Sequence, residues 1–471
     1  MPQKWWVLAT VACGTFMATL DSSIVNIALP TLTKVLGADL YQVKWVVIVY
    51  LLVITCFLLP FGRLSDQYGR KKIFSYGFLT FTLGSFLCGL APALDWLLLA
   101  RAIQGIGASM LMANGPAIIT AAFPAGERGR ALGTLSMVVS AGLVSGPSIG
   151  GLLITAFGWR SIFLVNLPIG IIGYLFVRRF VFWDRKTRVT APFDWVGAVL
   201  QMVLLLGFIM LVDPPSISIS GSNNYEVSRL FLLVVVAGLG ALFVKVESEV
   251  QAPLLDLSLL RIRTFWTANL ASFLTFVAYS SVSVLMPFFL EEILHFMPAK
   301  AGLFMTAIPL TIFVVAPVSG HLSDRIGSRS LSLMGTLVGA LGLFFLAGAF
   351  GTGVSGQISN IAIVLGLCTI GMATGLFQSP NNNAIMSAVP TEKLGVGSAL
   401  LATVRNLGLV TGTGIATKLF AWRQQDSGDM VSAFHWAFFT AGVVAVGAMI
   451  ASFAKGRDRH GLEAQRKRSY S

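Results

Sequence analysis

Asp21 lies inside a long apolar stretch, residues 5–30, and is the side chain of this chain best placed to do chemistry. About 20 apolar residues suffice to cross a lipid bilayer, so this stretch is long enough to do so. A carboxylate at that depth costs about 3 kcal/mol or more on insertion, and such groups usually serve transport, proton relay or ligand pairing. The alternative is a structural aspartate neutralised by a neighbouring helix. The polar neighbours Ser22, Ser23 and Asn26 favour a functional role.

Arg101 and Arg405 are comparable charges within other apolar stretches. Arg101 lies three residues before Gln104, so the two share a helix face. Because an arginine keeps its charge, it must be paired or hydrated at membrane depth. Asp21 is a natural partner for Arg101, and such a pair predicts a carboxyl group that takes up and releases a proton. Glu291, near the outer end of a later apolar stretch, is either a second proton-coupling group or a solvated carboxylate at a helix end.

The composition places these residues in a membrane protein. Of 471 residues, 55% are hydrophobic and 11% are charged, whereas soluble proteins average about 25% charged. The hydropathy pattern predicts fourteen membrane-spanning helices, hence an all-α polytopic protein. Most Lys and Arg residues fall in the two tails and in alternate loops, which predicts that both termini are cytoplasmic. The net charge of +13 therefore faces anionic lipid, and we expect no nucleic-acid partner.

Other chemistries lack their signatures in the sequence. The four cysteines lie in apolar stretches without metal-ligand spacing, so we expect neither disulfides nor a metal site. The four histidines form no triad with a nucleophile, and no phosphate-binding glycine loop is present. We therefore expect no cofactor and no enzymatic activity, and we read the first apolar stretch as a retained helix.

The chain repeats itself at a displacement of about eight helices. The pattern G-x-L-S-D-x-x-G begins at Gly62 and again 258 residues later at Gly320. Gly142-Leu-Val-Ser-Gly resembles the segment that begins at Gly408, 266 residues further on. The repeat predicts an N-terminal six-helix bundle over residues 1–183, two inserted helices with linkers over 184–264, a C-terminal six-helix bundle over 265–455 and a basic cytoplasmic tail over 456–471. Two parallel six-helix repeats are typical of the major facilitator fold.

Several motifs resemble a narrower group, the fourteen-spanner drug:proton antiporters of the major facilitator superfamily. The resemblance covers essentially the whole chain. It is carried by Leu20-Asp-Ser-Ser-Ile-Val-Asn-Ile-Ala-Leu-Pro30, by Arg101-Ala-Ile-Gln-Gly105, and by Gly142-x3-Gly-Pro-x2-Gly-Gly151. It also includes Gly62-Arg-Leu-Ser-Asp-Gln-Tyr-Gly-Arg-Lys-Lys72 and Trp159-Arg-x2-Phe-x2-Asn-x-Pro168.

The loop motif after the second span predicts a tight turn that requires glycine and a conformational latch on the cytoplasmic side. The resemblance implies that this latch favours the outward-open state; the alternative is a topological anchor made by the basic residues alone. The predicted latch residues are Gly62, Asp66, Gly69, Arg70 and, in the weaker second copy, Asp324.

Residues of the antiporter motif recur every four positions and line one helix face. Such a ridge lets another helix approach closely, and we expect this to occur across the interface between the two repeats. The ridge consists of Gly142, Gly146 and Gly150, and Pro147 is expected to bend the same helix. Polar residues in nearby apolar stretches predict contacts with the substrate. We expect Pro380 to break its helix, and the amides that follow it predict either substrate or gate contacts or a helix cap. The predicted substrate-cavity residues are Asn26, Gln104, Asn114, Gln378, Asn382 and Arg405.

Taken together, the sequence predicts a monomeric, proton-coupled antiporter of the cytoplasmic membrane. It would export hydrophobic, cationic compounds by alternating access, with small-molecule substrates, protons and membrane lipids as its partners. The alternatives are a dedicated exporter of one metabolite or lipid-like molecule, and a membrane sensor that does not transport.

Overall fold

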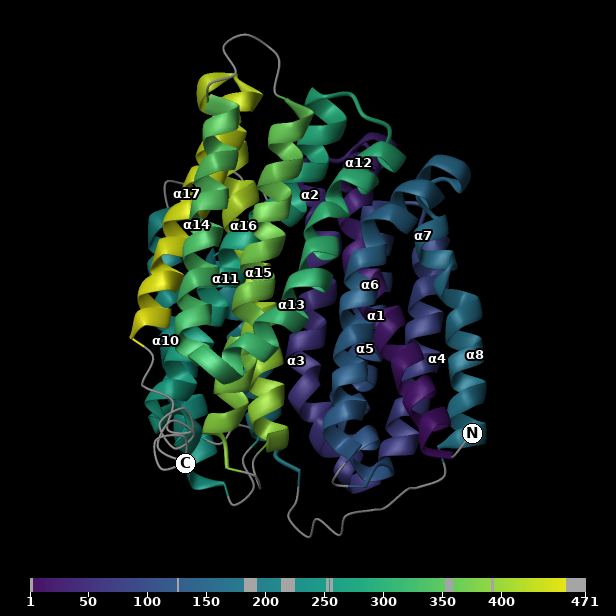
Figure 1. Ribbon diagram of the computed structural model, residues 1–471. Helices are drawn as coiled ribbons and strands as arrows, with labels where there is room; N and C mark the ends of the chain where they lie inside the picture. The colour runs from purple at the N-terminus through teal and green to yellow at the C-terminus, as the bar shows by residue number, and fades with distance from the viewer. Residues whose placement is uncertain are drawn as a thin grey trace. The chain divides into compact units, whose positions relative to one another are not determined.

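The structure of the chain is a computed structural model. It describes residues 3–124, 127–181, 193–212, 225–250, 254, 257–351, 359–390 and 394–454. Within these ranges the secondary structure is helical throughout (Figure 1). Thirteen of the described helices are long and apolar enough to cross a membrane. Helix α4 (Arg70–Gly89) occupies the third of the fourteen predicted spans; it is 20 residues long but less apolar than those thirteen.

The chain divides into two compact units. The first comprises Met1–Ser22, Leu32–Gly142 and Phe157–Leu257, and the second comprises Ser23–Thr31, Leu143–Ala156 and Ser258–Ser471. Two continuous helices, α1 (Gln3–Leu36) and α6 (Arg128–Phe157), contribute residues to both units. The division therefore runs through the middle of helices as well as between them.

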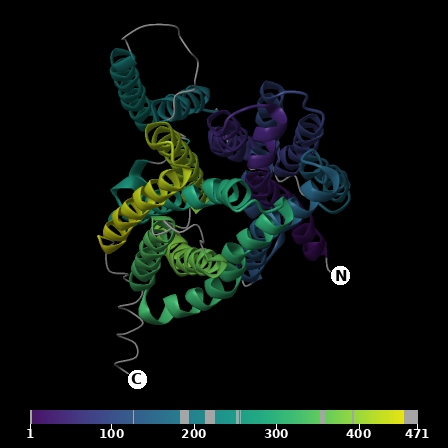
Figure 2. The same cartoon turned by 90° about the horizontal axis from the view of Figure 1, so that it is seen from above.

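The first unit holds the helices of the N-terminal repeat and the inserted pair. Helix α4 packs against α5 and α8, α3 packs against α5 and α9, and the inserted helices α9 and α10 lie side by side (Figure 2). Besides α1, α4 and α6, the helices are α2 (Leu40–Val43), α3 (Trp45–Tyr68), α5 (Leu94–Ala122), α7 (Ser161–Leu164), α8 (Asn166–Phe180), α9 (Trp195–Val212) and α10 (Tyr225–Glu249).

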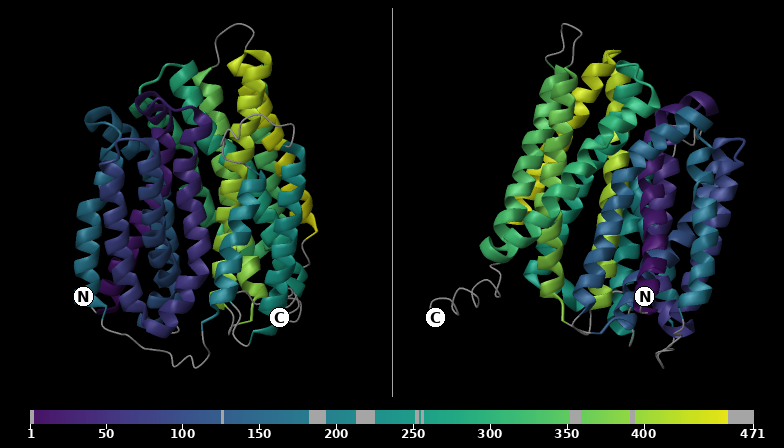
Figure 3. Two further views of the ribbon diagram at one scale, coloured as in Figure 1. Left: turned by 180° about the vertical axis from the view of Figure 1, so that it is seen from behind. Right: turned by 45° about the vertical axis from the view of Figure 1, so that its right-hand side comes forward.

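The second unit holds the helices of the C-terminal repeat. Helix α14 packs against α15 and α17, and α11 packs against α16 and α17 (Figure 3). Its elements are η2 (Leu257–Arg261), α11 (Arg263–Phe288), η3 (Phe289–Ile293), α12 (Pro298–Met305), α13 (Ala307–Ile326), α14 (Ser328–Gly351), α15 (Asn360–Ala388), α16 (Leu394–Ser427) and α17 (Met430–Phe453).

Glycines allow the helices of the first unit to approach backbone to backbone. A Cβ atom on Gly84 of α4 would lie 2.5 Å from the backbone nitrogen of Gln104 in α5. A Cβ atom on Gly107 of α5 would lie 2.3 Å from the backbone nitrogen of Phe81 in α4. Such contacts are the usual basis of close helix packing in membranes. These contacts fix the position of α5 relative to α4, and therefore the position of Gln104.

Candidate functional site

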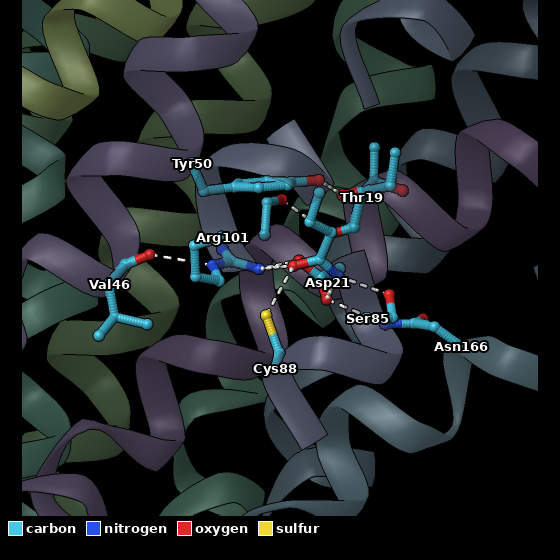
Figure 4. A network of polar contacts seen from close by, with 11 residues as sticks. Thr19, Asp21, Val46, Tyr50, Ser85, Cys88, Arg101 and Asn166 are labelled. Atoms are coloured by element: carbon cyan, nitrogen blue, oxygen red, sulfur yellow. Dashed lines mark hydrogen bonds and ion pairs between the residues drawn. The ribbon is translucent and has the colours of Figure 1, made fainter. Parts of the chain in front are cut away.

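The candidate site is centred on Asp21, in the middle of α1. Its side chain is fully buried, and that of Arg101, from α5, is 1% exposed. Nη1 of Arg101 donates to Oδ2 of Asp21 at 2.5 Å (Figure 4). The structure therefore pairs the two charges whose partnership the sequence suggested. A charge-assisted bond of this kind offsets part of the cost of burying both groups.

Two carboxamides complete the surroundings of the carboxylate. Nε2 of Gln104 donates to Oδ1 of Asp21 at 2.8 Å, and Nδ2 of Asn166 donates to the same oxygen at 2.9 Å. Gln104 lies one helical turn after Arg101 on α5, whereas Asn166 is the first residue of α8. Helices α1, α5 and α8 thus meet at one carboxyl group (Figure 4).

Arg101 is held by contacts other than its ion pair. Its Nε donates to the carbonyl of Val46 at 3.0 Å, and its guanidinium carbon lies 3.9 Å from the ring centroid of Tyr50. The hydroxyl of Tyr50 in turn donates to the carbonyl of Ala18, on α1. These contacts join α3 to the site and orient the guanidinium, which Lys, with a single compact ammonium, would not reproduce.

Gln104 is bonded at every polar position of its side chain. Its Nε2 donates to Oγ of Ser85 at 2.7 Å as well as to Asp21. Its Oε1 accepts from Nη1 of Arg101 at 2.6 Å and from the thiol of Cys88 at 3.8 Å. The residue predicted to contact substrate therefore has a structural place inside the buried network.

Every side chain bonded to Asp21 donates a hydrogen bond to it. Adding a proton would cancel its charge and remove one of its acceptor sites. Arg101 would then lose its counterion within an interior where unpaired charges are costly. Chemically, the site is a buried carboxyl group whose contacts involve several helices.

Glu291 lies in the second unit, in the π-helical turn η3 that follows α11. Its side chain is 6% exposed, so the expectation of a solvated carboxylate at a helix end is wrong. The π-helical turn adds a residue to the helical turn and redirects the side chains that follow, and such turns often occur at functional sites. Its role as a second proton-coupling group stays a prediction.

The other residues predicted to contact substrate lie on helices α1, α5, α15 and α16, and they stay predictions in that role. Asn114 donates from Nδ2 to the carbonyl of Met110, one turn earlier on α5. Asn26, Gln378, Asn382 and Arg405 are half-buried, and across the described part of the chain Arg405 has neither a hydrogen bond nor an ion pair. Pro380 does not break its helix, because α15 continues to Ala388 and carries the amides within it.

The loop motif is organised around one glycine in each copy. Gly69 has φ 104° between α3 and α4, and Gly327 has φ 88° between α13 and α14, values that favour glycine. Gly62 was expected in this turn, but it lies within α3, and nothing approaches the position of its Cβ within 4 Å. Arg70 donates to the carbonyl of Ala117 at 3.1 Å. The side chains of Asp66 and Asp324 lie outside the described residues.

The glycine ridge of α6 faces α1. A Cβ atom on Gly142 would lie 2.2 Å from Oγ1 of Thr19, and one on Gly146 would lie 2.4 Å from Oγ of Ser23. A Cβ atom on Gly150 would meet Ile24. The expectation that these glycines pack across the interface between the repeats is therefore wrong, because their partner belongs to the same repeat.

Other positions of α6 contact α12, a helix of the C-terminal repeat. These positions of α6 and α12 both belong to the second compact unit. A Cβ on Gly151 would lie 2.4 Å from the carbonyl oxygen of Pro298, and one on Gly302 would lie 2.2 Å from that of Pro147. The hydroxyls of Ser148 and Thr306 are hydrogen-bonded. The antiporter motif thus has two faces, one for α1 and one for α12.

Sequence reasoning missed several members of the site. Asn166 stood in a motif of the family but was not assigned to Asp21, and Ser85 and Tyr50 gave no signal beyond being polar residues in apolar helices. Asn381 was also missed; its Nδ2 donates to the carbonyl of Ala268 and links α15 to α11. The motif around Asn166 was the one signal that could have identified a partner.

Comparison with known proteins decides the family. The model of the Major Facilitator Superfamily matches residues 11–413, and also residues 270–469. The chain belongs to the Major Facilitator Superfamily. It is therefore a multi-pass membrane transporter with the fold that the sequence predicted.

Relatives within the Major Facilitator Superfamily include transporters and resistance proteins. The chain is 35% identical to the riboflavin transporter RibZ of Clostridioides difficile, with 89% of each chain covered. It is 32% identical to the multidrug resistance protein Stp of Mycobacterium tuberculosis, covering 88% of this chain and 76% of that one. It is 31% identical to the methylenomycin A resistance protein of Streptomyces coelicolor, covering 86% and 83%.

A solved structure has the same fold. The bacterial homologue of the human lysosomal transporter Spinster, in an inward-facing and unoccupied conformation, matches with a TM-score of 0.69 over 98% of both chains. The two sequences are 15% identical, so this likeness concerns the fold alone.

Proposed function

We propose that this member of the Major Facilitator Superfamily exports hydrophobic compounds, cationic ones among them, in exchange for protons that bind to Asp21. The observation that carries the proposal is the complete burial of Asp21 among Arg101, Gln104 and Asn166, all of which donate to it. A proton on this carboxyl group would change contacts with α5 and α8 together, and so would connect proton binding to helix movement.

The energy for export would come from the proton gradient. A proton moving down a potential of 100 mV supplies about 2.3 kcal/mol, and a pH gradient adds to this. We place the protein in the cytoplasmic membrane with both termini in the cytoplasm, because the basic residues are concentrated in those tails and loops. Multidrug and antibiotic resistance proteins among the relatives support efflux as the direction of transport.

A dedicated exporter of one metabolite is the second candidate, and the 35% identity to a riboflavin transporter favours it. The two proposals differ in breadth, which a substrate panel measures directly. Cells that express the protein should lose ethidium, other lipophilic cations and uncharged drugs faster than control cells, and a protonophore should stop this. Efflux confined to riboflavin or one similar aromatic compound would support the dedicated exporter instead.

Asp21→Asn should abolish coupling, because asparagine preserves the shape and an acceptor for Arg101 but cannot bind or release a proton. The measurement is substrate-evoked proton movement by the purified protein in liposomes with an imposed pH gradient. Asp95→Asn is the matched control, since Asp95 is an exposed acid at the start of α5 and should retain coupling. Normal coupling in Asp21→Asn would exclude Asp21 as the proton carrier and direct attention to Glu291.

A further inference from the structure

The surroundings of Asp21 are suited to only one of its protonation states. Its contacts come from Arg101, Gln104 and Asn166, each through an N–H group, and the described residues provide no other hydrogen bond to this carboxylate. An ionised carboxylate accepts from all three. A protonated carboxyl also carries an O–H group, which needs an acceptor in a buried site.

Two of the three neighbours have no acceptor to offer. The guanidinium of Arg101 has donors only. Gln104 has both amide hydrogens and its oxygen engaged, with Asp21, Ser85, Arg101 and Cys88. Rotating the carboxamide of Gln104 would turn its NH2 group toward the donors of Arg101, so this side chain is fixed in its orientation.

Asn166 differs from both. Its side chain is fully buried, its Nδ2 donates to Asp21, and its Oδ1 has no hydrogen-bond partner among the described residues. A half-turn about its terminal side-chain bond exchanges the two ends of the carboxamide. The oxygen then faces Asp21 and the NH2 group takes the place that the oxygen had, so the number of unbonded polar groups on Asn166 does not rise.

We propose that Asn166 is the positioning residue that responds to the protonation of Asp21. Its amide group donates to the ionised carboxylate, and after rotation its oxygen accepts from the protonated carboxyl. The inference rests on the proposed function, in which Asp21 binds the transported proton. It identifies the group that would accept a hydrogen bond from the protonated, buried carboxyl of Asp21, namely the side-chain oxygen of Asn166.

The position of Asn166 connects this change to the backbone. It begins α8, and Val165 separates it from the short helix α7. The other titratable side chains around Asp21 are Arg101 from α5, Tyr50 from α3 and Cys88 from α4. Among these groups, the hydroxyl of Tyr50 is engaged with the carbonyl of Ala18 and the thiol of Cys88 with Gln104. The rotation of Asn166 is therefore the least disruptive response of the site to a proton.

Infrared difference spectroscopy of the full-length protein tests the proposal. The acid-minus-neutral spectrum of the wild-type protein should contain a carboxyl band that is lost in Asp21→Asn. It should also contain side-chain amide bands that shift when the asparagines carry nitrogen-15. Asn166→Leu, which has similar volume but no polar group, should remove those amide bands and shift the Asp21 carboxyl band.

Asn269→Leu is the matched control. Asn269 is also a buried asparagine that donates from Nδ2, to the carbonyl of Phe265, and its Oδ1 likewise has no partner among the described residues. It lies on α11 in the second unit, so its replacement should change neither band. Asn166→Gln retains a carboxamide and should keep amide bands in the spectrum.

The outcomes separate the two proposals. If no band is lost in Asp21→Asn, proton binding at Asp21 is refuted and the switch with it. If the Asp21 band is present but the wild-type spectrum has no nitrogen-15-sensitive amide bands, the switch is overturned while the proposed function stands. This second comparison uses no substitution at Asn166, so it is decisive even where Asn166→Leu fails to fold.

Discussion

Arg101 shows how much of this site depends on one side chain. It bonds to Asp21, Gln104 and the Val46 carbonyl, and it stacks on Tyr50. A buried ion pair contributes little net stability compared with an apolar pair, whereas removing one partner typically costs about 3–5 kcal/mol, because the other charge stays buried. The remaining group matters here, since a carboxylate escapes this cost by binding a proton.

We therefore expect the stability loss of Arg101→Ala to depend on pH. Its folded state would retain a proton on Asp21 that the unfolded chain releases, so folding stability should fall as the pH rises. Thermal unfolding in detergent at pH 5 and pH 8 measures this. In Arg101→Ala with Asp21→Asn the carboxyl group is gone, and the loss should be alike at both pH values. An equal loss in the single variant at both pH values would contradict the pairing as the source of its stability.

The sequence predicted the pairing of Asp21 with Arg101, and it placed Gln104 on the helix face of Arg101, because depth in an apolar stretch and helical spacing are visible in one chain. It assigned Gln104 to substrate contact and not to Asp21. It did not predict Asn166 as their partner, since this contact joins residues 145 positions apart and depends on where α8 begins. For Glu291, the alternative of a solvated carboxylate at a helix end was wrong, because its side chain is buried in the π-helical turn η3, which has no obvious sequence signal.

At the scale of helices, the crossing of α4 and α5 positions the site. Gly84 faces the backbone of Gln104, so its lack of a side chain sets the distance between the two helices. Backbone atoms cannot move aside as the end of a side chain can. A methyl group at this position must displace α5, and with it Gln104 and Arg101.

Gly84→Ala should lower the unfolding temperature and weaken proton coupling. The control is Gly238→Ala in α10, where nothing lies within 4 Å of the added Cβ atom. That replacement removes the entropic cost of glycine in a helix, which is about 0.5–1 kcal/mol in the free energy of unfolding. It should therefore leave the unfolding temperature unchanged or raise it. Similar effects of the two substitutions in thermal unfolding and liposome assays would argue against the crossing as a positioning element.

The helices themselves were predictable because backbone polar groups in lipid must bond within their own segment. Hydropathy therefore locates them, α1 and α15 included. It does not locate their irregularities: Pro380 was expected to end α15, yet the helix continues for eight residues to Ala388. Proline is tolerated within membrane helices where neighbouring groups satisfy the freed carbonyl.

At the scale of the whole molecule, α6 belongs to the first repeat but its residues Leu143–Ala156 cluster with the second. There α6 contacts α12 through backbone atoms at Pro147 and Gly151 and through the hydroxyls of Ser148 and Thr306. Alternating access requires such contacts between repeats to form and break during each cycle. The hydroxyl pair marks the place to test this.

The paired substitution Ser148→Cys with Thr306→Cys should form a disulfide on oxidation, because the two hydroxyls already touch. The cross-link should stop transport, and a reductant should restore it. Each single substitution under the same oxidant is the control and should remain active. Transport that continues at full rate with the cross-link formed would show that α6 and α12 stay together throughout the cycle.

The thiol of Cys88 gives this transporter a native reporter. It is fully buried, and its Sγ lies 3.8 Å from Oε1 of Gln104, the residue that also bonds to the carboxyl group of Asp21. Alkylating reagents attack the thiolate and so need the sulfur to meet water. The alkylation rate of Cys88 therefore measures how often solvent reaches the buried network around Asp21. This measurement needs neither an engineered label nor a known substrate.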